Sequence, residues 1–155
     1  MIPDTVNNFL HRQRVDFEVV THRPTATSLE TVHAAHIPAD RLAKGVVFED
    51  GERYVLAVIP ATHRVDPWAL GDLLDRDVFI ADEDDFAMVF RDCRQGAVPP
   101  LGEAYGMSTV VDDSLIDLPD IYFECGDHEH VIHIDGEDFA KLMATAQHGP
   151  ISHHI

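Results

Sequence analysis

A glycine- and proline-rich stretch, residues 91–107 (RDCRQGAVPPLGEAYGM), is the first place where the sequence could hold a site. Its helix and strand breakers are Gly96, Pro99, Pro100, Gly102 and Gly106. Neither a helix nor a central strand tolerates that density of breakers. The stretch also contains apolar Ala97, Val98 and Leu101, which favours a rigid, partly buried loop with exposed backbone N–H groups. Loops held on a scaffold often carry sites, and a proline-stiffened connection without a site is the alternative.

Lys44 is a second candidate for a functional role, because it stands directly before an apolar run, GVVF. A lysine at such a place commonly extends its ammonium to water while its stem packs on apolar surface. The alternative is that Lys44 points into a pocket as a fixed cation. The chain has only one other lysine, Lys141, and this scarcity favours the second interpretation slightly.

Histidines are abundant, but their spacing gives only a weak metal signal. His33 and His36 are one helical turn apart, with no cysteine or carboxylate at a matching offset. We expect His128, His130 and His133 to fall on one strand, where period two places His128 and His130 on the same face. Two histidines without a third ligand do not make a complete site, so no metal is predicted.

Familiar catalytic and cofactor motifs are missing from the sequence. Ser108 and Ser114 do not lie in a G-x-S-x-G elbow. Cys93 and Cys125 form no nucleophile motif, zinc pattern or disulfide framework. There is no phosphate-binding P-loop or dinucleotide fingerprint. The motifs alone therefore identify a loop and a candidate lysine without identifying a reaction.

The pattern of the chain predicts one α/β domain with a mixed sheet over residues 1–146 and a flexible tail at 147–155. Alternating, β-rich residues at 43–60 around Gly51 predict a hairpin whose second strand is buried on both faces. A helix over 28–37 is expected to be capped by Thr27 or Ser28, and another over 67–74 has Pro67 after Asp66. Further helices are expected at 3–13, 81–90 and 137–146, and further strands at 15–21, 77–80, 107–111, 121–124 and 130–135.

Length and composition describe a globular chain of 155 residues, 45% of them hydrophobic. No apolar run is long enough to span a membrane, and the first residues do not have the pattern of a secretory signal. With two cysteines and no disulfide framework, we expect a reduced, cytoplasmic protein. Membranes and DNA are not expected partners.

The charge is strongly acidic and unevenly distributed. The chain has 28 acidic and 11 basic residues, a formal net charge of −17. Residues 1–64 carry seven basic and eight acidic side chains, and residues 65–155 carry four and twenty. A field of that sign repels nucleic acid, so any polyanion is expected to approach through the first half. The candidate phosphate contacts there are Arg12, Arg14, Arg23 and Arg41.

Several segments together resemble the YbaK/EbsC-like aminoacyl-tRNA deacylases, which are similar to the editing insertion of bacterial prolyl-tRNA synthetases. The similarity runs from about residue 3 to residue 143 and rests on two specific features in the family's order. One is the lysine that enters an apolar strand, in DRLAKGVVFEDG, and the other is the G-x-x-P-P-x-G loop, in DCRQGAVPPLGEAYGM. The VDDSL turn and the segment YFECGDHEHVIHIDGEDF follow them. The resemblance implies a mixed, mostly antiparallel, barrel-like sheet flanked by helices.

The resemblance also implies an activity, hydrolysis of the ester bond in a mischarged aminoacyl-tRNA, carried out in trans to the synthetase and without cofactor or metal. Small amino acids such as alanine or serine are the expected substrates. Lys44 matches the family's essential lysine, and Gly96 and Gly102 match the loop that lines the aminoacyl pocket. The other matched or expected substrate contacts are Val98, Pro99, Pro100, His128 and Arg41. Gly45 stands where relatives often have a small hydroxyl residue or asparagine.

Two classes of function remain open at this stage. In the first, the chain is an editing enzyme that binds the acceptor end of a mischarged tRNA weakly, with dependence on salt or on an aminoacyl-tRNA synthetase partner. In the second, it is an inactive relative that binds aminoacyl or nucleotide ligands as a sensor module. Ester hydrolysis passes through an oxyanion that backbone N–H groups on a rigid loop can stabilise, which is consistent with the missing catalytic triad.

Overall fold

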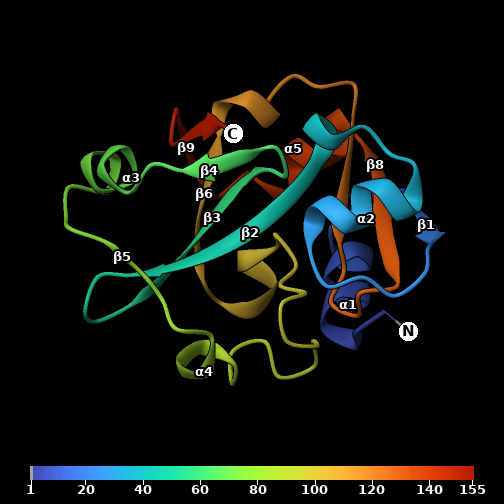
Figure 1. The fold of residues 1–155 in the computed structure, drawn as a ribbon, viewed down its shortest axis with the longest axis horizontal. Helices are drawn as coiled ribbons and strands as arrows, with labels where there is room; N and C mark the ends of the chain where they lie inside the picture. The colour runs from blue at the N-terminus through green and yellow to red at the C-terminus, as the bar shows by residue number, and fades with distance from the viewer. Residues whose placement is uncertain (1) are drawn as a thin grey trace.

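The hairpin of β2 (Leu42–Glu49) and β3 (Tyr54–Pro60) lies at the centre of the computed structural model, which describes residues 2–155. The two strands pair over their length, from Ala43 opposite Pro60 to Glu49 opposite Tyr54. Every residue of β3 after Tyr54 is buried. The hairpin and its buried second strand are therefore confirmed. In Figure 1 these strands cross the middle of the molecule, with α3 and α4 on one side and α1 and α2 on the other.

Eight strands form one mixed sheet around this hairpin. Its order is β1 (Glu18–Thr21), β8 (His130–Asp135), β7 (Asp120–Glu124), β2, β3, β6 (Ser108–Asp112) and β9 (Gln147–Gly149), and β5 (Phe79–Ile80) pairs with β2. The β2–β7, β3–β6 and β6–β9 pairs are parallel, and the other pairs are antiparallel. The predicted mixed sheet is thus confirmed, with a strand order that runs as an open path from β1 to β9.

Helices flank the sheet, and their first turns follow the capping signals of the sequence. The described α-helices are α1 (Asp4–Arg12), α2 (Ser28–Ala35), α3 (Pro67–Leu74), α4 (Glu83–Phe86) and α5 (Gly136–Leu142), and short 3-10 turns occur at η1 (Ala39–Arg41), η2 (Gly102–Tyr105) and η3 (Asp113–Leu115). Thr27 forms a capping box with Glu30 on α2, and Asp66 caps α3 before Pro67. None of the helices within residues 2–155 has the length and hydropathy that a membrane crossing requires.

The helix expected over 81–90 is shorter than its pattern suggested. Asp82 caps α4, which ends at Phe86. Beyond it the chain continues in turns, with Val89 N–H bonded to Phe86 O and Cys93 N–H bonded to Phe90 O. These bonds span three residues, which is the tighter geometry common at helix ends. The chain is thereby redirected into the loop at 91–107.

The C-terminal residues differ from the flexible tail predicted for 147–155. β9 pairs with β6, and β10 (Ser152–His154) pairs with β4 (His63–Val65), a strand that the sequence analysis did not predict. Between β9 and β10, Ile151 is 1% exposed and packs in a cluster that includes Ile59 and Leu70. Its N–H donates to Asp112 Oδ1 at 2.9 Å. The tail is ordered because this buried anchor holds it between two strand pairs.

This anchor predicts a stability difference between two C-terminal isoleucines. Ile151→Ala removes a buried side chain and should lower the free energy of unfolding by about 2–4 kcal/mol. Ile155 is 65% exposed, so Ile155→Ala should change it by no more than about 0.5 kcal/mol. Urea unfolding of both variants and the wild type measures the difference, and equal effects would contradict the anchoring role of Ile151.

Candidate functional site

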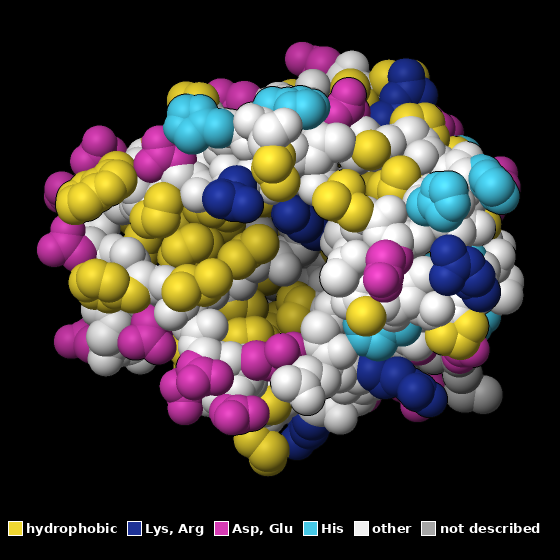
Figure 2. All heavy atoms as spheres, viewed as in Figure 1, with side chains coloured by type: hydrophobic (Ala, Val, Ile, Leu, Met, Phe, Trp, Pro, Cys, Tyr) yellow, Lys and Arg dark blue, Asp and Glu magenta, His cyan; other side chains and the backbone are white. Residues whose placement is uncertain are grey.

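Residues of the loop and of the strands that the sequence analysis singled out line a cavity of about 230 Å³. Lys44 of β2, Gly96 and Val98 of the loop, and Glu124 of β7 line it. The rest of the lining is Ser28, Gly45, Val46, Val47, Ile80, Ala81, Glu83 and Phe86. Figure 2 shows hydrophobic side chains in a hollow at the middle of this face, with basic side chains at its upper edge and acidic side chains below it.

Sheet register explains why Lys44 and Glu124 meet in this cavity. β2 and β7 pair in parallel, with Leu42 opposite Tyr122 and Ala43 opposite Phe123. One residue further along each strand brings Lys44 level with Glu124. Neighbouring residues at the same level of a sheet lie on the same face. The site therefore depends on a pairing between segments that are far apart in the sequence.

Lys44 is a half-buried cation that lines the cavity. Its Nζ donates to the carbonyl oxygen of Ala61 at 3.4 Å, and none of the described carboxylates forms an ion pair with it. Burial lowers the pKa of Lys44, and the like charge of Arg64 lowers it further. Arg64, on β4, is exposed. Arg64 is therefore near Lys44 without lining the cavity, and the sequence analysis did not include it among the candidate contacts.

The loop at 91–107 is partly buried, as predicted, because Ala97 and Leu101 are almost fully enclosed in the structure. Arg94 N–H donates to Gly126 O at 2.8 Å and fixes the loop to the turn before β8. Gly126 has φ +115°, and a Cβ there would lie 2.8 Å from Cys93 Sγ. Glycine is therefore required at 126 both for the backbone angle and for the close approach of the loop.

Gly96 places a backbone N–H at the edge of the cavity. That N–H donates to Glu83 Oε1 at 2.5 Å, and Gln95 Nε2 donates to Glu83 Oε2 at 3.4 Å. Glu83 also lines the cavity, at the start of α4. The Gly96 N–H thus donates to an anionic oxygen, and an oxyanion formed during ester hydrolysis needs a donor of this kind.

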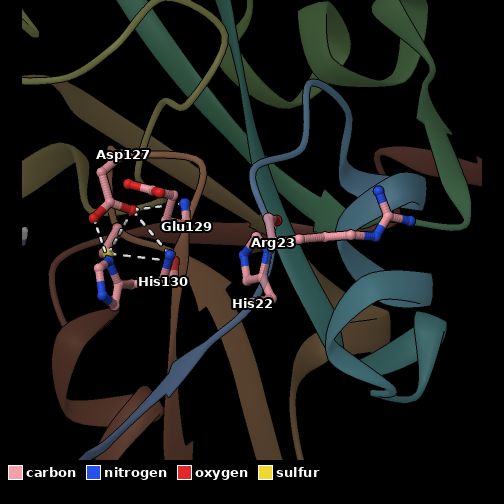
Figure 3. Close-up of polar contacts among 6 residues, drawn as sticks. His22, Arg23, Asp127, Glu129 and His130 are labelled. Carbon is pink, nitrogen blue, oxygen red and sulfur yellow. Dashed lines mark hydrogen bonds and ion pairs between the residues drawn. The ribbon is translucent and has the colours of Figure 1, made fainter.

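His128 lies in a turn and not on the strand predicted for it. Its φ is +63°, and β8 begins two residues later at His130. The turn forms because the Asp127 carboxylate accepts from the backbone N–H groups of Glu129 and His130 and from the His130 ring (Figure 3). His128 and His130 therefore do not share a strand face.

The His128 ring instead contacts the loop. Its Nε2 donates to Gln95 O at 2.6 Å, since a carbonyl oxygen can only accept. An added Cβ on Gly96 would lie 3.5 Å from His128 Cε1. His128 is therefore next to the Gly96 N–H at the rim of the cavity.

Glu124 is the functional candidate that the sequence analysis missed. The side chain is 6% exposed, and Thr31 Oγ1 donates to its Oε1 at 2.6 Å. Burial raises the pKa of this carboxyl, while the Thr31 hydrogen bond opposes the rise. The signal was present in IYFEC, because a glutamate inside an apolar strand must find a partner or a ligand.

Besides His128, four predicted contacts do not line the cavity. Arg41 forms an ion pair with Asp120 at 2.5 Å. Pro99 and Pro100 are buried within the loop. Gly102 is also buried, and a Cβ there would lie 2.0 Å from Thr109 Oγ1. Pro99, Pro100 and Gly102 shape the loop in the structure, whereas Gly96 and Val98 reach the cavity.

Two other features of the described residues bear on the site. No group of three or more histidine, cysteine or acidic side chains within residues 2–155 has a geometry that could hold a metal ion. A larger cavity of about 720 Å³ lies between α3 and β5, lined by Trp68, Asp72 and Phe79 among others. None of the residues predicted for chemistry lines that larger cavity, so the smaller one is the candidate site.

Comparison with known proteins places this arrangement in a family. The model of the aminoacyl-tRNA editing domain family matches residues 22–142, which include every residue of the cavity. The chain belongs to the aminoacyl-tRNA editing domain family. None of the curated proteins matches it in sequence.

Three solved structures share the fold at low sequence identity. The hypothetical protein APE2540 superposes with a TM-score of 0.85 at 18% identity, covering 97% of this chain and all of the other. A candidate trans-editing enzyme for prolyl-tRNA synthetase gives 0.83 at 17%, covering 99% of both chains. A signal-transduction candidate from Marinobacter aquaeolei VT8 gives 0.79 at 20%, covering 98% of this chain and 31% of that longer protein. These likenesses extend the editing fold over nearly the whole chain.

The burial of Glu124 predicts a stability difference that grows with pH. A carboxyl whose pKa is raised by folding costs no stability below its unfolded pKa of 4.5. The cost grows as the pH rises from that value to the raised pKa, and it is fully present above the raised pKa. Glu124→Gln keeps an acceptor for Thr31 and removes that cost. Its melting temperature relative to the wild type should therefore rise between pH 4 and pH 8. A difference that stays constant or falls over this range would contradict the raised pKa.

Proposed function

We propose that this editing-domain protein hydrolyses the ester bond of aminoacyl-tRNAs that carry the wrong small amino acid, such as alanine or serine. The observation that carries the proposal is the convergence of Lys44, the Gly96 N–H and Glu124 on one cavity. At about 230 Å³, this cavity is smaller than the roughly 300–1,000 Å³ of most small-molecule sites. It suits an aminoacyl group better than a whole nucleotide. The substrate would place the reaction in the cytoplasm.

The chemistry is the addition of water to the ester carbonyl. The water oxygen bonds to the acyl carbon, and the carbonyl oxygen gains negative charge. The Gly96 N–H is the donor for that oxygen, and the Lys44 ammonium supplies a fixed positive charge nearby. The bond to the terminal ribose oxygen then breaks, and that oxygen takes a proton. The products are a free amino acid and a tRNA with a free hydroxyl, and the neighbouring ribose hydroxyl helps to position the attacking water.

Binding of the acceptor end must overcome a net charge of −17. Lys44, which lines the cavity, and Arg64 near it provide a local basic pair, whose proximity lowers the pKa of Lys44. We assign the terminal phosphates to this pair. Arg12, Arg14 and Arg23 are further contacts on the near-neutral half, whereas Arg41 is already paired with Asp120. Affinity for tRNA should be weak and should fall steeply as the salt concentration rises. An aminoacyl-tRNA synthetase partner would then deliver the mischarged tRNA.

Selection among small amino acids is assigned to the walls of the cavity. A Cβ on Gly45 would lie 2.9 Å from Leu56 Cδ1 and 3.4 Å from Val98 Cγ1. A larger residue there would take space between β2 and the loop. His128 contributes to this selection because its ring bonds the Gln95 carbonyl and lies next to Gly96. Steric overlap excludes larger amino-acid side chains more strongly than favourable contacts select among smaller ones. The contact of one methylene group contributes only about 1–3 kcal/mol to that selection.

A second candidate function is a binding module that keeps the cavity but does not hydrolyse the ester. The contact between Glu83 and the Gly96 N–H favours it, because the donor needed for the oxyanion is engaged. In the enzyme, substrate must displace the Glu83 carboxylate. In a binding module, that contact persists and the loop only recognises its ligand.

Replacement of Lys44 separates the two functions. Lys44→Ala should lower single-turnover hydrolysis of alanine- and serine-mischarged tRNA by about 100-fold or more, the scale expected for loss of a group that stabilises developing charge. Lys44→Arg should rescue poorly, because a planar guanidinium does not replace a compact ammonium. Circular dichroism serves as the folding control.

Two outcomes would contradict the proposal, one for the role of Lys44 and the other for the enzyme. Rapid wild-type hydrolysis that survives Lys44→Ala would rule out the assigned role of Lys44. A wild type that hydrolyses none of a broad panel of mischarged tRNAs, yet binds them, would favour the binding module.

Glu83 offers a test of the loop donor. Glu83→Ala frees the Gly96 N–H, so KM for mischarged tRNA should fall several-fold with kcat nearly unchanged. Asp84→Ala is the matched control, because it removes the same charge from the adjacent, exposed residue. A similar fall in KM for both variants would mean that general charge repulsion, and not competition at Gly96, is responsible.

A further inference from the structure

We propose that Glu124 binds the α-ammonium group of the aminoacyl substrate and thereby restricts the site to esters with a free amine. The inference rests on the proposed function, and it assigns the substrate group that the buried carboxyl recognises. One carboxyl oxygen of Glu124 has no partner among the described residues. Glu124 Oε2 is buried and accepts no hydrogen bond from any of residues 2–155, although the residue lines the cavity.

The position of this carboxyl is fixed by a chain of hydroxyl groups. Thr31 Oγ1 lies 2.6 Å from both Glu124 Oε1 and Thr25 Oγ1. A hydroxyl has one proton to donate, so Thr31 donates to the carboxyl and accepts from Thr25. All three side chains are buried. Oε1 is therefore occupied and oriented, and Oε2 is the oxygen left for a ligand.

A second buried polar atom without a partner lies near Glu124. His22, which is 7% exposed, has its Nδ1 2.7 Å from Arg23 O. A carbonyl can only accept, so the ring donates to it through Nδ1 and leaves Nε2 as its other nitrogen. That Nε2 is buried and has no partner among the described residues. Figure 3 shows the His22 and Arg23 pair beside the turn formed by Asp127 and His130.

A buried carboxylate oxygen without a donor, in the lining of a cavity, indicates a ligand group that supplies donors. Buried polar atoms left unpaired cost free energy, and an ammonium supplies three N–H donors and a positive charge. Lys44 does not fill this role, because its Nζ contacts Ala61 O and forms no ion pair with the described carboxylates. Glu83 is engaged with the Gly96 N–H. The α-ammonium is the cation that an aminoacyl ester brings into the cavity, and Glu124 is the carboxyl available to it.

The test compares two stable analogues that differ only in the amine. They are 3′-deoxy-3′-(L-alanylamino)adenosine and its propanoylamino counterpart, which lacks the α-amine. Wild type should bind the first about 10–100-fold more tightly in calorimetry, the range expected for a hydrogen bond to a charged group. Glu124→Gln presents an N–H to the ammonium and should reduce the preference below about threefold. Glu52→Gln, at an exposed position in the β2–β3 turn, should keep it.

Equal binding of the two analogues by wild type, binding of neither, or a preference that survives Glu124→Gln would overturn the inference. Melting temperatures verify that the variants are folded. Hydrolysis of alanyl-tRNA and lactyl-tRNA adds a second readout, because lactate replaces the amine by a hydroxyl. An equal loss on both esters in Glu124→Gln would assign Glu124 to the reacting atoms and reject its role toward the amine.

The same measurements separate this inference from the proposed hydrolysis. A wild type that hydrolyses no ester, but prefers the amine-bearing analogue and loses that preference in Glu124→Gln, would reject the enzyme and retain the ammonium site. A wild type that hydrolyses both esters equally would retain the enzyme and reject the ammonium site.

Discussion

Pairing of β2 with β3 is the interaction on which the other elements depend. Seven residue pairs join the strands, and β3 is buried along almost its whole length. A buried hairpin cannot leave its backbone edges in contact with apolar side chains alone, since each N–H and C=O needs a partner. β7 and β6 supply those partners in parallel. The candidate site lies at one of these added edges, where β7 carries Glu124 to the level of Lys44.

Local patterns in the sequence predicted the local structure well. The hairpin, the Asp66–Pro67 start of α3 and the capped start of α2 each depend on a few neighbouring residues. Lys44, Gly96 and Val98 could also be identified as candidate site residues, because their motifs are contiguous. The end of α4 was missed because it depends on competing turns, and the ordered tail because Ile151 finds its pocket only after β3 and α3 have met.

The missed parts of the site share a physical reason. Glu124, Glu83 and Arg64 reach Lys44 or Gly96 only through long-range pairing and loop packing. A glutamate in an apolar strand indicates that its carboxyl needs a partner or a ligand. Which residue it lies beside depends on the strand register. His128 shows the same dependence, since the Asp127 side chain turns the backbone and takes the histidine off the strand.

Charge inside the cavity differs from charge over the whole chain, and this difference suits an aminoacyl ester. Over the molecule, acidic residues greatly exceed basic ones, which disfavours tight binding of a long polyanion. The cavity is lined by a lysine and two carboxyls, one held by a backbone N–H and the other buried with an oxygen that has no partner among the described residues. Such a site attracts a small group that carries positive and negative charge a short distance apart. The end of an aminoacyl-tRNA has this pattern, with an α-ammonium a few bonds from an ester carbonyl that becomes anionic during hydrolysis. Recognition can then come mainly from the last few atoms of the substrate, which is consistent with weak contacts to the remainder of the tRNA.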